Sequence, residues 1–403
     1  MPRASSPAAI VTILCVAEVL SMLGFGAFPA LLPGFMAEWR LSNTDAGWIN
    51  GIYYAGYLGA VPVLASLTDR IAPWRIYAWC MVLAAVASLG FAVFVEGFWG
   101  ALVFRTLAGV ALAGTYMPGL KLLSDILGGA GGGRSVAFYT ASFGVGTAIS
   151  FFFVGEVDAL VGWRWTFALT AAGPIIALLI AFLFVPRPAT DPNTVPDTHL
   201  LDFRPVLRSR AAMGYVLAYT AHNFELFAFR SWIVAYLVFA EGLSGVTLVV
   251  GATALAALFN LLGLPSSVIG NELAARFGRH RVITIIMLMS GAVACVLGFA
   301  ATLPQWALLA LCVVYGILII GESASVTAGV VQAAPEGYRG ATMAVHSCIG
   351  FSGSFAGPLV FGVVLDLAGG QSVTAWGLAF ASAGIGAFLG PLALFLLRER
   401  KSV

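Results

Sequence analysis

Apolar stretches of about 20 residues recur along the whole chain, and this recurrence constrains the fold more than any other feature. Each stretch is long enough to cross a hydrocarbon core about 30 Å thick as an α-helix. A helix satisfies its own backbone hydrogen bonds in lipid, which irregular chain cannot do. Charged residues make up only 9% of the 403 residues, against about 25% in soluble domains. The pattern predicts an all-α integral membrane protein.

We predict about twelve transmembrane helices. The first stretch is too long for the apolar core of a signal peptide and has no cleavage-type sequence after it, so we expect it to be a span. The predicted limits are 10–36, 46–67, 76–95, 99–123, 136–160, 166–185, 213–239, 246–270, 282–302, 305–328, 341–364 and 373–397.

Basic residues predict the side of the membrane that each loop faces. The turns after odd-numbered spans carry few of them, chiefly Arg40 and Arg164. Positive loops stay in the cytoplasm, so we expect a multi-pass protein of the cytoplasmic (inner) membrane with both termini cytoplasmic. The basic residues of the cytoplasmic side are Arg3, Arg70, Arg75, Lys121, Arg134, Arg187, Arg204, Arg208, Arg210, Arg276, Arg279, Arg281, Arg339, Arg398, Arg400 and Lys401.

A proline-rich polar segment divides the spans six and six. Five prolines with mixed charge favour an extended, solvated linker over residues 186–212. We therefore expect a six-helix bundle at 1–185 and a second at 213–403. The loops after spans 2 and 8 also align, with Arg70 matching Arg276 and Arg75 matching Arg281. Matching loops predict parallel repeats about an axis along the membrane normal.

Five short motifs occur in order along the chain. The loop at 65–75 keeps four residues of the pattern G-x-L-A-D-R-x-G-R-R (Leu67, Asp69, Arg70, Arg75) and departs from it at Ala65, Ala72 and Trp74. The second copy keeps Leu-Ala-x-Arg-Phe-Gly-Arg at 273–279, with Ala275 in place of the acid. The others are Arg-x-x-x-Gly at 105–109, Gly-Trp-Arg-Trp-Thr-Phe at 162–167 and Pro-Glu-Gly-Tyr-Arg-Gly at 335–340.

With these motifs the chain resembles the major facilitator superfamily over nearly its full length. The resemblance implies two pseudo-symmetric six-helix bundles and a secondary transporter that works by alternating access. It also implies a cytoplasmic gate built on Asp69, because a carboxylate beside a helix N-terminus is stabilised by exposed N–H groups. The basic residues of the two matching loops are its expected companions: Arg70, Arg75, Arg276, Arg279 and Arg281.

Ionisable residues inside the apolar stretches are the candidate functional residues. A charge at bilayer depth costs about 2.5–3.5 kcal/mol, so such residues tend to border water or bind something. The richest group lies on span 7 within about 160° of arc, and this polar side should face the interior or a cavity. It consists of Tyr219, His222, Asn223, Glu225 and Arg230.

Within this group, Glu225 and Arg230 are five residues apart and should not pair along the helix. Arg230 therefore needs another partner, either a distant acid or an anionic substrate. The alternative interpretation of the whole group is a buried polar network that only fixes packing.

Four further intramembrane residues join the substrate-binding or proton-coupling candidates. Glu18 is a proton site or an arginine partner, or alternatively a neutral carboxylic acid in the core. Arg105 matches the arginine linked to proton coupling in the resembling family, or else braces helix packing. Glu322 shares a polar stripe with Tyr315, with snorkelling to the interface as the alternative.

His346 shares a face with Gly350, Gly353 and Gly357, which we interpret as a close-packing face. We therefore expect His346 to be structural. The same small-residue pattern at Gly386 and Gly390 could pack within or between chains, so the oligomeric state stays open, with a monomer as the expectation.

The leading functional hypothesis is a proton-coupled carrier of a small organic anion or zwitterion, because arginine cannot shed its charge and binds such groups bidentately. The first alternative is a proton-driven efflux antiporter for amphipathic compounds. The glycine–proline motif of that branch is missing from span 5, and spans 2 and 8 lack the arginines of nitrate carriers. A non-transporting membrane sensor or scaffold is a third possibility, disfavoured because no soluble domain is evident.

An enzyme is not expected, because no nucleophile–base motif, phosphate loop or metal cluster is present. We expect no cofactor and no bound metal, since the five cysteines fall in apolar stretches without metal-ligand spacing. A net charge of +2 gives no reason to expect nucleic acid. The expected partners are a small-molecule substrate, protons and the lipid bilayer, while substrate identity, direction and stoichiometry stay open.

Overall fold

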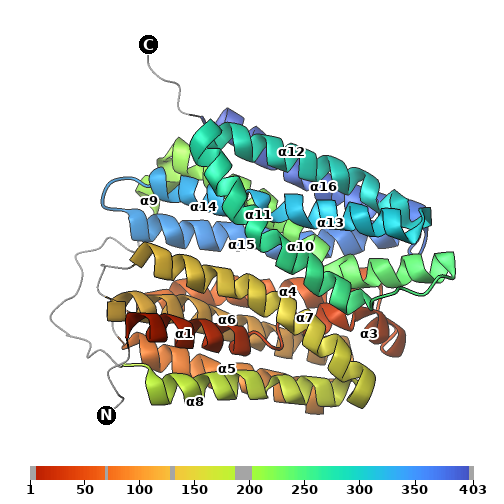
Figure 1. Ribbon diagram of the computed structural model, residues 1–403, viewed down its shortest axis with the longest axis horizontal. Coiled ribbons are helices and arrows are strands. Elements are labelled where there is room, and N and C mark those ends of the chain that lie inside the picture. Colours follow the sequence, from red (N-terminus) through yellow and green to blue (C-terminus); the bar gives the residue numbers. More distant parts are fainter. Residues whose placement is uncertain (1–5, 69–70, 128–131, 187–201, 399–403) are drawn as a thin grey trace. The chain divides into compact units, whose positions relative to one another are not determined.

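A computed structural model describes residues 6–68, 71–127, 132–186 and 202–398, and within these ranges every regular element is a helix (Figure 1). Nine helical segments of this part are long and apolar enough to cross a membrane, and one of them, Ser135–Phe184, contains two predicted spans. The predicted spans 1 and 2 are occupied by shorter helices and by the 25-residue helix α4 (Asn43–Leu67). The all-α membrane fold is therefore confirmed.

The chain packs into two compact units. The first is formed by Met1–Leu31 with Ala55–Asp197, and the second by Leu32–Tyr54 with Thr198–Val403. The sequence-based division at 186–212 did not predict that Leu32–Tyr54 packs with the second unit. One consequence is that α4 begins in the second unit and ends in the first.

The first unit consists of mutually packed helices around an apolar core. α1 packs against α7 and α8, and α5 packs against α6, α7 and α8. The core beside α1 contains Leu14, Tyr77, Met81 and Tyr139. The helices are α1 (Pro7–Ser21), α2 (Ala27–Ala30), the second part of α4, α5 (Pro73–Phe94), α6 (Phe98–Leu127), α7 (Gly132–Thr170) and α8 (Ala172–Phe184).

The predicted first span is interrupted in the structure after Ser21. The interruption is tolerated because Ser150 of α7 satisfies the backbone groups that it frees. The Ser150 hydroxyl accepts a hydrogen bond from the Gly26 backbone N (2.9 Å) and donates one to the Leu23 carbonyl (2.7 Å). A hydroxyl on a neighbouring helix thus replaces part of the helical ladder.

The predicted turn between spans 5 and 6 is a sharp kink inside α7. Gly162 adopts φ 77° and ψ 166°, a conformation that favours glycine. Arg164 then stacks on Trp163, with its guanidinium carbon 4.4 Å from the ring centroid, and donates from Nη1 to the Ala92 carbonyl (2.9 Å). These contacts explain why the Gly-Trp-Arg sequence stands at this turn.

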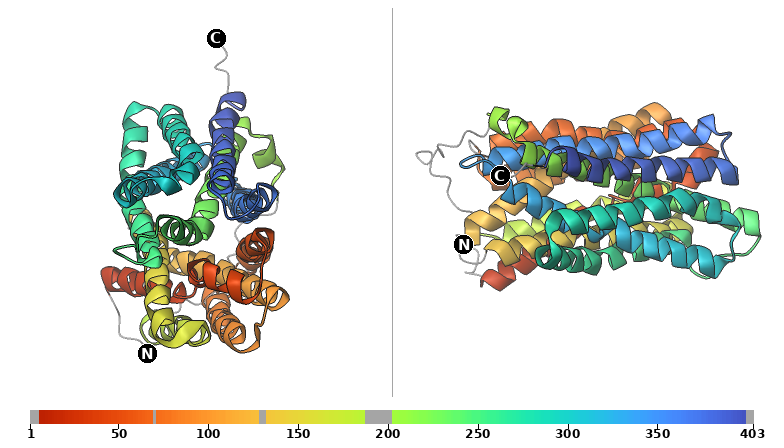
Figure 2. Two further views of the ribbon diagram at one scale, coloured as in Figure 1. Left: turned by 90° about the vertical axis from the view of Figure 1, so that its right-hand side faces the viewer. Right: turned by 90° about the horizontal axis from the view of Figure 1, so that it is seen from above.

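The second unit is built around one long helix, α10. α10 packs extensively on α15 and α16 and also contacts α14 and α11. Figure 2 shows the long helices of this unit running along a common direction. Its elements are α3 (Leu32–Glu38), the first part of α4, α9 (Arg204–Arg208), α10 (Arg210–Ser244), α11 (Ala252–Phe277), α12 (Arg279–Leu297), the 3₁₀ turn η1 (Gly298–Thr302), α13 (Gln305–Gly321), α14 (Ser323–Gln332), α15 (Arg339–Leu367) and α16 (Val373–Leu396).

Glycines on α15 let it approach the α10 backbone. A Cβ at Gly353 would lie 2.1 Å from the Thr220 carbonyl oxygen, and one at Gly357 would lie 2.1 Å from the Phe224 carbonyl oxygen. No side chain fits at such distances. The sequence-based prediction that this glycine stripe is a close-packing face is confirmed.

Two further elements differ from the predicted limits. The predicted span at 305–328 is divided at Glu322, between α13 and α14. The predicted linker contains the short helix α9, and α10 starts at Arg210 because the Ser209 hydroxyl accepts from the Ala212 backbone N and caps it. Because this segment is rich in prolines and polar residues, the sequence did not identify Ser209 as a helix cap.

Candidate functional site

The buried ionisable residues of the second unit lie on and around the middle of α10. In its most apolar window, 72% of the residues are buried within the protein. Such a helix has almost no lipid-facing side, so its polar residues must find partners on neighbouring helices. The structure shows three such partners, which are Ser290, Glu322 and Asn260.

Glu225 of α10 accepts a hydrogen bond from a residue of α12. Its Oε1 accepts a hydrogen bond from the Ser290 hydroxyl at 2.6 Å, and the side chain is fully buried. The Tyr315 hydroxyl of α13 is buried as well and has no hydrogen-bond partner among the described residues. Oε2 finds no hydrogen-bond partner among the described residues. A buried carboxyl oxygen in this state is able to hold a proton or a water molecule.

His222 and Glu322 form a buried pair. Nδ1 of His222 lies 2.8 Å from Oε1 of Glu322, with side chains 1% and 0% exposed. Glu322 occupies the break between α13 and α14, so the pair joins α10 to a helix discontinuity. The snorkelling alternative for Glu322 is wrong, because its carboxyl group points into the protein rather than to the interface.

Two more residues predicted from span 7 complete the surroundings of this pair. The Tyr219 ring lies between the two histidines, with centroids 5.8 Å from His222 and 4.0 Å from His346. Asn223 donates to the Gly350 carbonyl at 3.0 Å and is therefore a packing contact to α15. The pair and the Tyr219 and His346 rings thus form one largely buried cluster of polar side chains on α10, α15 and the break between α13 and α14.

Arg230 has a neutral partner. Its Nε donates to Oδ1 of Asn260 on α11 at 2.7 Å, and its guanidinium carbon lies 5.3 Å from the Phe227 ring centroid. The side chain is 7% exposed. No carboxylate of the described residues forms an ion pair with it. Glu225 and Arg230 therefore have separate partners, and the positive charge of Arg230 is not cancelled by an acid of this part of the chain.

In the first unit, Glu18 has one partner. Its Oε2 accepts from the Tyr139 hydroxyl of α7 at 2.9 Å, and the side chain is fully buried. Tyr139 in turn stacks on Tyr116 of α6, with ring centroids 5.8 Å apart. Arg105, also buried, places its guanidinium carbon 5.7 Å from the Phe28 ring centroid. Glu18 and Arg105 thus contact aromatic residues of the same unit.

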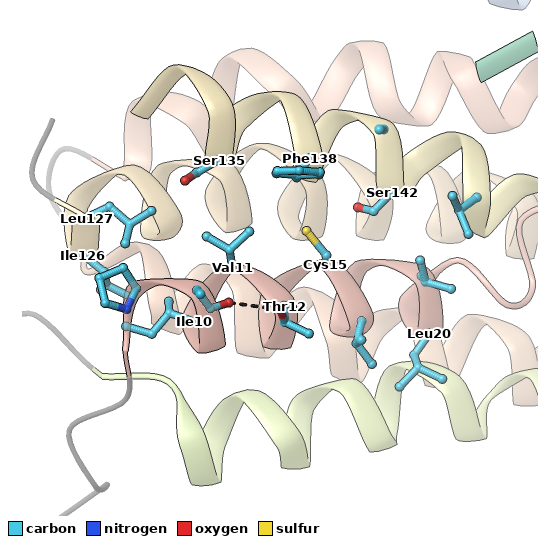
Figure 3. A pocket seen from close by; sticks show the side chains of 16 residues that line it. Ile10, Val11, Thr12, Cys15, Leu20, Ile126, Leu127, Ser135, Phe138 and Ser142 are labelled. Atoms are coloured by element: carbon cyan, nitrogen blue, oxygen red, sulfur yellow. Dashed lines mark hydrogen bonds between the residues drawn. The ribbon is translucent and has the colours of Figure 1, made fainter. Parts of the chain in front are cut away.

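A pocket of about 1090 Å³ lies in the first unit between α1, the end of α6 and the start of α7. Figure 3 shows Val11 and Cys15 of α1 pointing towards Phe138 and Ser142 of α7. The walls are mainly aliphatic and aromatic, with a few hydroxyl and thiol groups. The lining residues are Pro7, Ala8, Ile10, Val11, Thr12, Cys15, Val16, Val19, Leu20, Ile126, Leu127, Ser135, Phe138, Ala141, Ser142 and Val145.

The predicted gate is described only in part. Asp69 and Arg70 lie outside the described residues, while Arg75, Arg276 and Arg281 are exposed. Arg279 donates from Nη1 to Oδ1 of Asn271 (3.0 Å) and to the Ser325 carbonyl (2.9 Å), so it ties the start of α12 to α11 and α14. The gate stays a prediction.

The sequence did not reveal the partners Tyr139, Ser290 and Asn260. Each is a single polar residue in an apolar stretch, which is a weak signal because isolated hydroxyl and amide groups are common in membrane helices. Only the fold shows that each faces an ionisable residue of another helix.

A helical bundle of this length, with ionisable groups buried at mid-helix, is typical of a polytopic membrane protein. The sequence profile of the Major Facilitator Superfamily matches residues 14–358 and 253–403. The chain belongs to this superfamily.

Named relatives are distant in sequence. Human Protein spinster homolog 1 is 25% identical over 253 residues, covering 60% of this chain and 47% of that protein. An Arabidopsis thaliana protein named as a probable sphingolipid transporter, spinster homolog 1, is 21% identical and covers 57% of each. A Haemophilus influenzae protein named as a metabolite transport protein is 22% identical, over 86% of this chain and 88% of that one. The chain spans about half the length of the spinster relatives.

Solved structures share the fold at low identity. A bacterial homolog of the human lysosomal transporter Spinster, in an inward-facing and occupied conformation, has a TM-score of 0.74 at 16% identity over 98% of this chain and 96% of that one. The nucleoside transporter NupG has a TM-score of 0.76 at 15% identity over 97% and 100%. At such identities the likeness concerns the fold alone.

Proposed function

We propose that this protein is a proton-coupled secondary transporter that carries an organic anion or zwitterion by alternating access. The observation that carries the substrate class is Arg230. It is buried, its Nε binds a neutral amide, and no described carboxylate neutralises it. A buried guanidinium without a counterion is costly, and an anionic group of the substrate would relieve that cost.

Proton coupling is supported by carboxyl groups that are buried but not fully hydrogen-bonded. Glu225 and Glu18 each have one oxygen bound to a hydroxyl and the other without a partner among the described residues. The His222–Glu322 pair adds a third place where one proton can be gained or lost. We assign proton carriage to these groups and charge recognition to Arg230, with Arg105 as a second cationic candidate.

A second candidate function is transport of amphipathic compounds, including efflux. Two observations favour it: the mainly apolar pocket of the first unit, and one relative whose name refers to sphingolipid transport. A molecule with an anionic head and an apolar portion would satisfy both candidates. The size of the apolar portion is therefore the property to vary in an experiment.

The proposed location is the cytoplasmic membrane with both termini in the cytoplasm, because the basic loop residues gather on one predicted side. Asp69, Arg70 and Arg75 with Arg276, Arg279 and Arg281 are proposed to form the cytoplasmic gate. A monomer is the proposed assembly.

The test is uptake by proteoliposomes with an imposed pH gradient, over carboxylates, zwitterions and lipophilic cations. We expect a carboxylate or zwitterion to accumulate only with the gradient, and Glu225→Gln to abolish accumulation while substrate exchange persists. Glu241→Gln is the matched control, since Glu241 lies at the end of the same helix and its carboxylate accepts a hydrogen bond from the Leu248 backbone N. Accumulation of cations alone, or gradient-driven uptake by Glu225→Gln at the wild-type rate, would overturn the proposal.

A further inference from the structure

Asp366, at the C-terminal end of α15, covers the N-terminus of α4 in the second unit. Its Oδ1 accepts hydrogen bonds from the backbone N (3.1 Å) and Nδ2 (2.7 Å) of Asn43. Its Oδ2 accepts from the backbone N (2.7 Å) and hydroxyl (2.6 Å) of Thr44. Backbone N–H groups at a helix start lack partners within the helix and carry partial positive charge, so a carboxylate is stabilised there.

α4 does not need Asp366 to cap its N-terminus, because nearby residues already do so. Asp45 of its first turn accepts from the backbone N (3.1 Å) and hydroxyl (2.7 Å) of Ser42, and the Ser42 hydroxyl accepts from the Asp45 backbone N (3.0 Å). This local capping arrangement already terminates the helix. The Asp366 contacts, made 323 residues further along the chain, are therefore a link between helices.

Below this link, α4 and α15 approach each other closely at glycines, and the Trp48 ring of α4 lies 5.6 Å from the Phe355 ring of α15, measured between centroids. A Cβ at Gly47 would lie 2.7 Å from the Pro358 carbonyl oxygen, and one at Gly51 would lie 2.6 Å from the Phe355 carbonyl oxygen. A Cβ at Gly362 would lie 2.2 Å from the Asn43 carbonyl oxygen. Glycine faces part or slide with few rotamer changes. Asp366 supplies four directional hydrogen bonds to this seam.

The position of α4 gives the link a role in movement. Residues up to Tyr54 pack in the second unit, and those from Ala55 pack in the first, where Gly56 lies against the Thr106 carbonyl. If the units move during transport, α4 must either bend near residue 54 or detach from α15. The helix is continuous there, and Asp366 is exposed, so water can replace its hydrogen bonds. Detachment is the route that the structure favours.

We infer that Asp366 is a releasable latch, whose hydrogen bonds to Asn43 and Thr44 hold the first half of α4 on α15 and break in each transport cycle. The inference rests on the proposed transport function, because only alternating access requires the contact to open. The latch itself is a conformational property, so it is measurable without substrate.

The experiment measures a distance between spin labels at Ala37→Cys on α3 and Thr374→Cys on α16, with the five native cysteines replaced. Both positions are exposed and belong to the second unit. We expect one narrow distance population in the otherwise unaltered chain. Asp366→Asn and Asp366→Ala should raise a second, longer population by about fivefold or more, because several hydrogen bonds are weakened together. Asp45→Asn removes a carboxylate from the same helix end and should not do so.

A covalent version tests the cycle. Thr44→Cys with Asp366→Cys should lose at least about tenfold in uptake on oxidation and recover with reductant, while the oxidised wild type is unaffected. Unchanged label distances in both Asp366 variants, or wild-type uptake by the oxidised pair, would overturn the latch. If no tested solute is transported, the distance measurement still decides on the latch, so its failure is separable from failure of the proposed function.

Discussion

The two units bind a buried acid in the same way, through one hydroxyl group, but differ in what lies around it. In the first unit, Glu18 has one hydrogen bond, from Tyr139, and a pocket of about 1090 Å³ opens along the same helix. In the second unit, Glu225, Glu322 and Arg230 are each bound to a different neighbouring helix. The comparison teaches that the second unit combines its ionisable groups with its packing, whereas the first has a pocket along the helix that carries its acid, although the acid itself is buried and does not line the pocket.

The largest effect is expected from packing in the second unit. Gly353→Val should prevent accumulation of folded protein, because even a Cβ would lie 2.1 Å from the Thr220 carbonyl oxygen of α10. Size-exclusion yield in detergent measures this. Gly34→Val is the control, since nothing lies within 4 Å of a Cβ there. A normal yield of Gly353→Val would show that the contact between α10 and α15 adjusts easily to a larger side chain. The packing difference between the two units would then be wrong.

The next effect concerns Arg230. Arg230→Ala should weaken substrate binding by about 100-fold or more, since a charge-assisted, bidentate contact is worth several hydrogen bonds. Arg230→Lys should recover only part of it, because an ammonium group lacks the guanidinium fork. Competition binding of carboxylate substrates measures the loss. Equal loss for uncharged ligands would mean that Arg230 only positions Asn260 and Phe227.

A smaller effect is expected from the hydroxyl groups that bind the acids. Tyr139→Phe and Ser290→Ala each remove one hydrogen bond to a buried carboxyl group, at a cost of about 1–3 kcal/mol in stability. The pH at which gradient-driven uptake is half-maximal should move in both variants. Thermal unfolding gives the stability, and uptake over a pH series gives the shift. A shift only in Ser290→Ala would assign proton carriage to the second unit alone.

The smallest effect is expected in the pocket of the first unit. Phe138→Ala should weaken binding of long-chain amphipathic compounds by about tenfold, in line with the apolar area that it removes, and leave small carboxylates unaffected. Thermal-shift titration with a series of increasing chain length measures it. Val249→Ala, an exposed residue of the second unit, is the control. Equal weakening of small carboxylates would show that the pocket serves every substrate.

The sequence predicts the helical membrane fold well, because a bilayer permits few alternatives to long apolar helices. It also identifies the buried ionisable residues, since charge in an apolar stretch is conspicuous. It does not predict the break after Ser21 or the packing of Leu32–Tyr54 with the second unit. The break depends on Ser150 of α7, and the packing on glycines matched across α4 and α15. Both are tertiary contacts without a local signal.

Partners were missed for a related reason. We expected Arg230 to need an acid or an anionic substrate, and the structure gives it the amide of Asn260. For Glu322 the sequence left a polar stripe with Tyr315 and snorkelling to the interface as alternatives, and the structure turns it inward to His222 at the break between α13 and α14. The position of a residue along a helix can be predicted from the sequence. The direction in which its side chain points cannot be predicted where the helix is broken.

The enclosure of α10 by other helices has a consequence for the cell. Acyl chains have almost no direct access to the middle of this helix. The chemistry of His222 and Glu225 is thereby insulated from changes in bilayer composition, such as those that accompany growth temperature. A bundle built around such a sheltered axis keeps the contacts of these two residues when the surrounding lipids are remodelled.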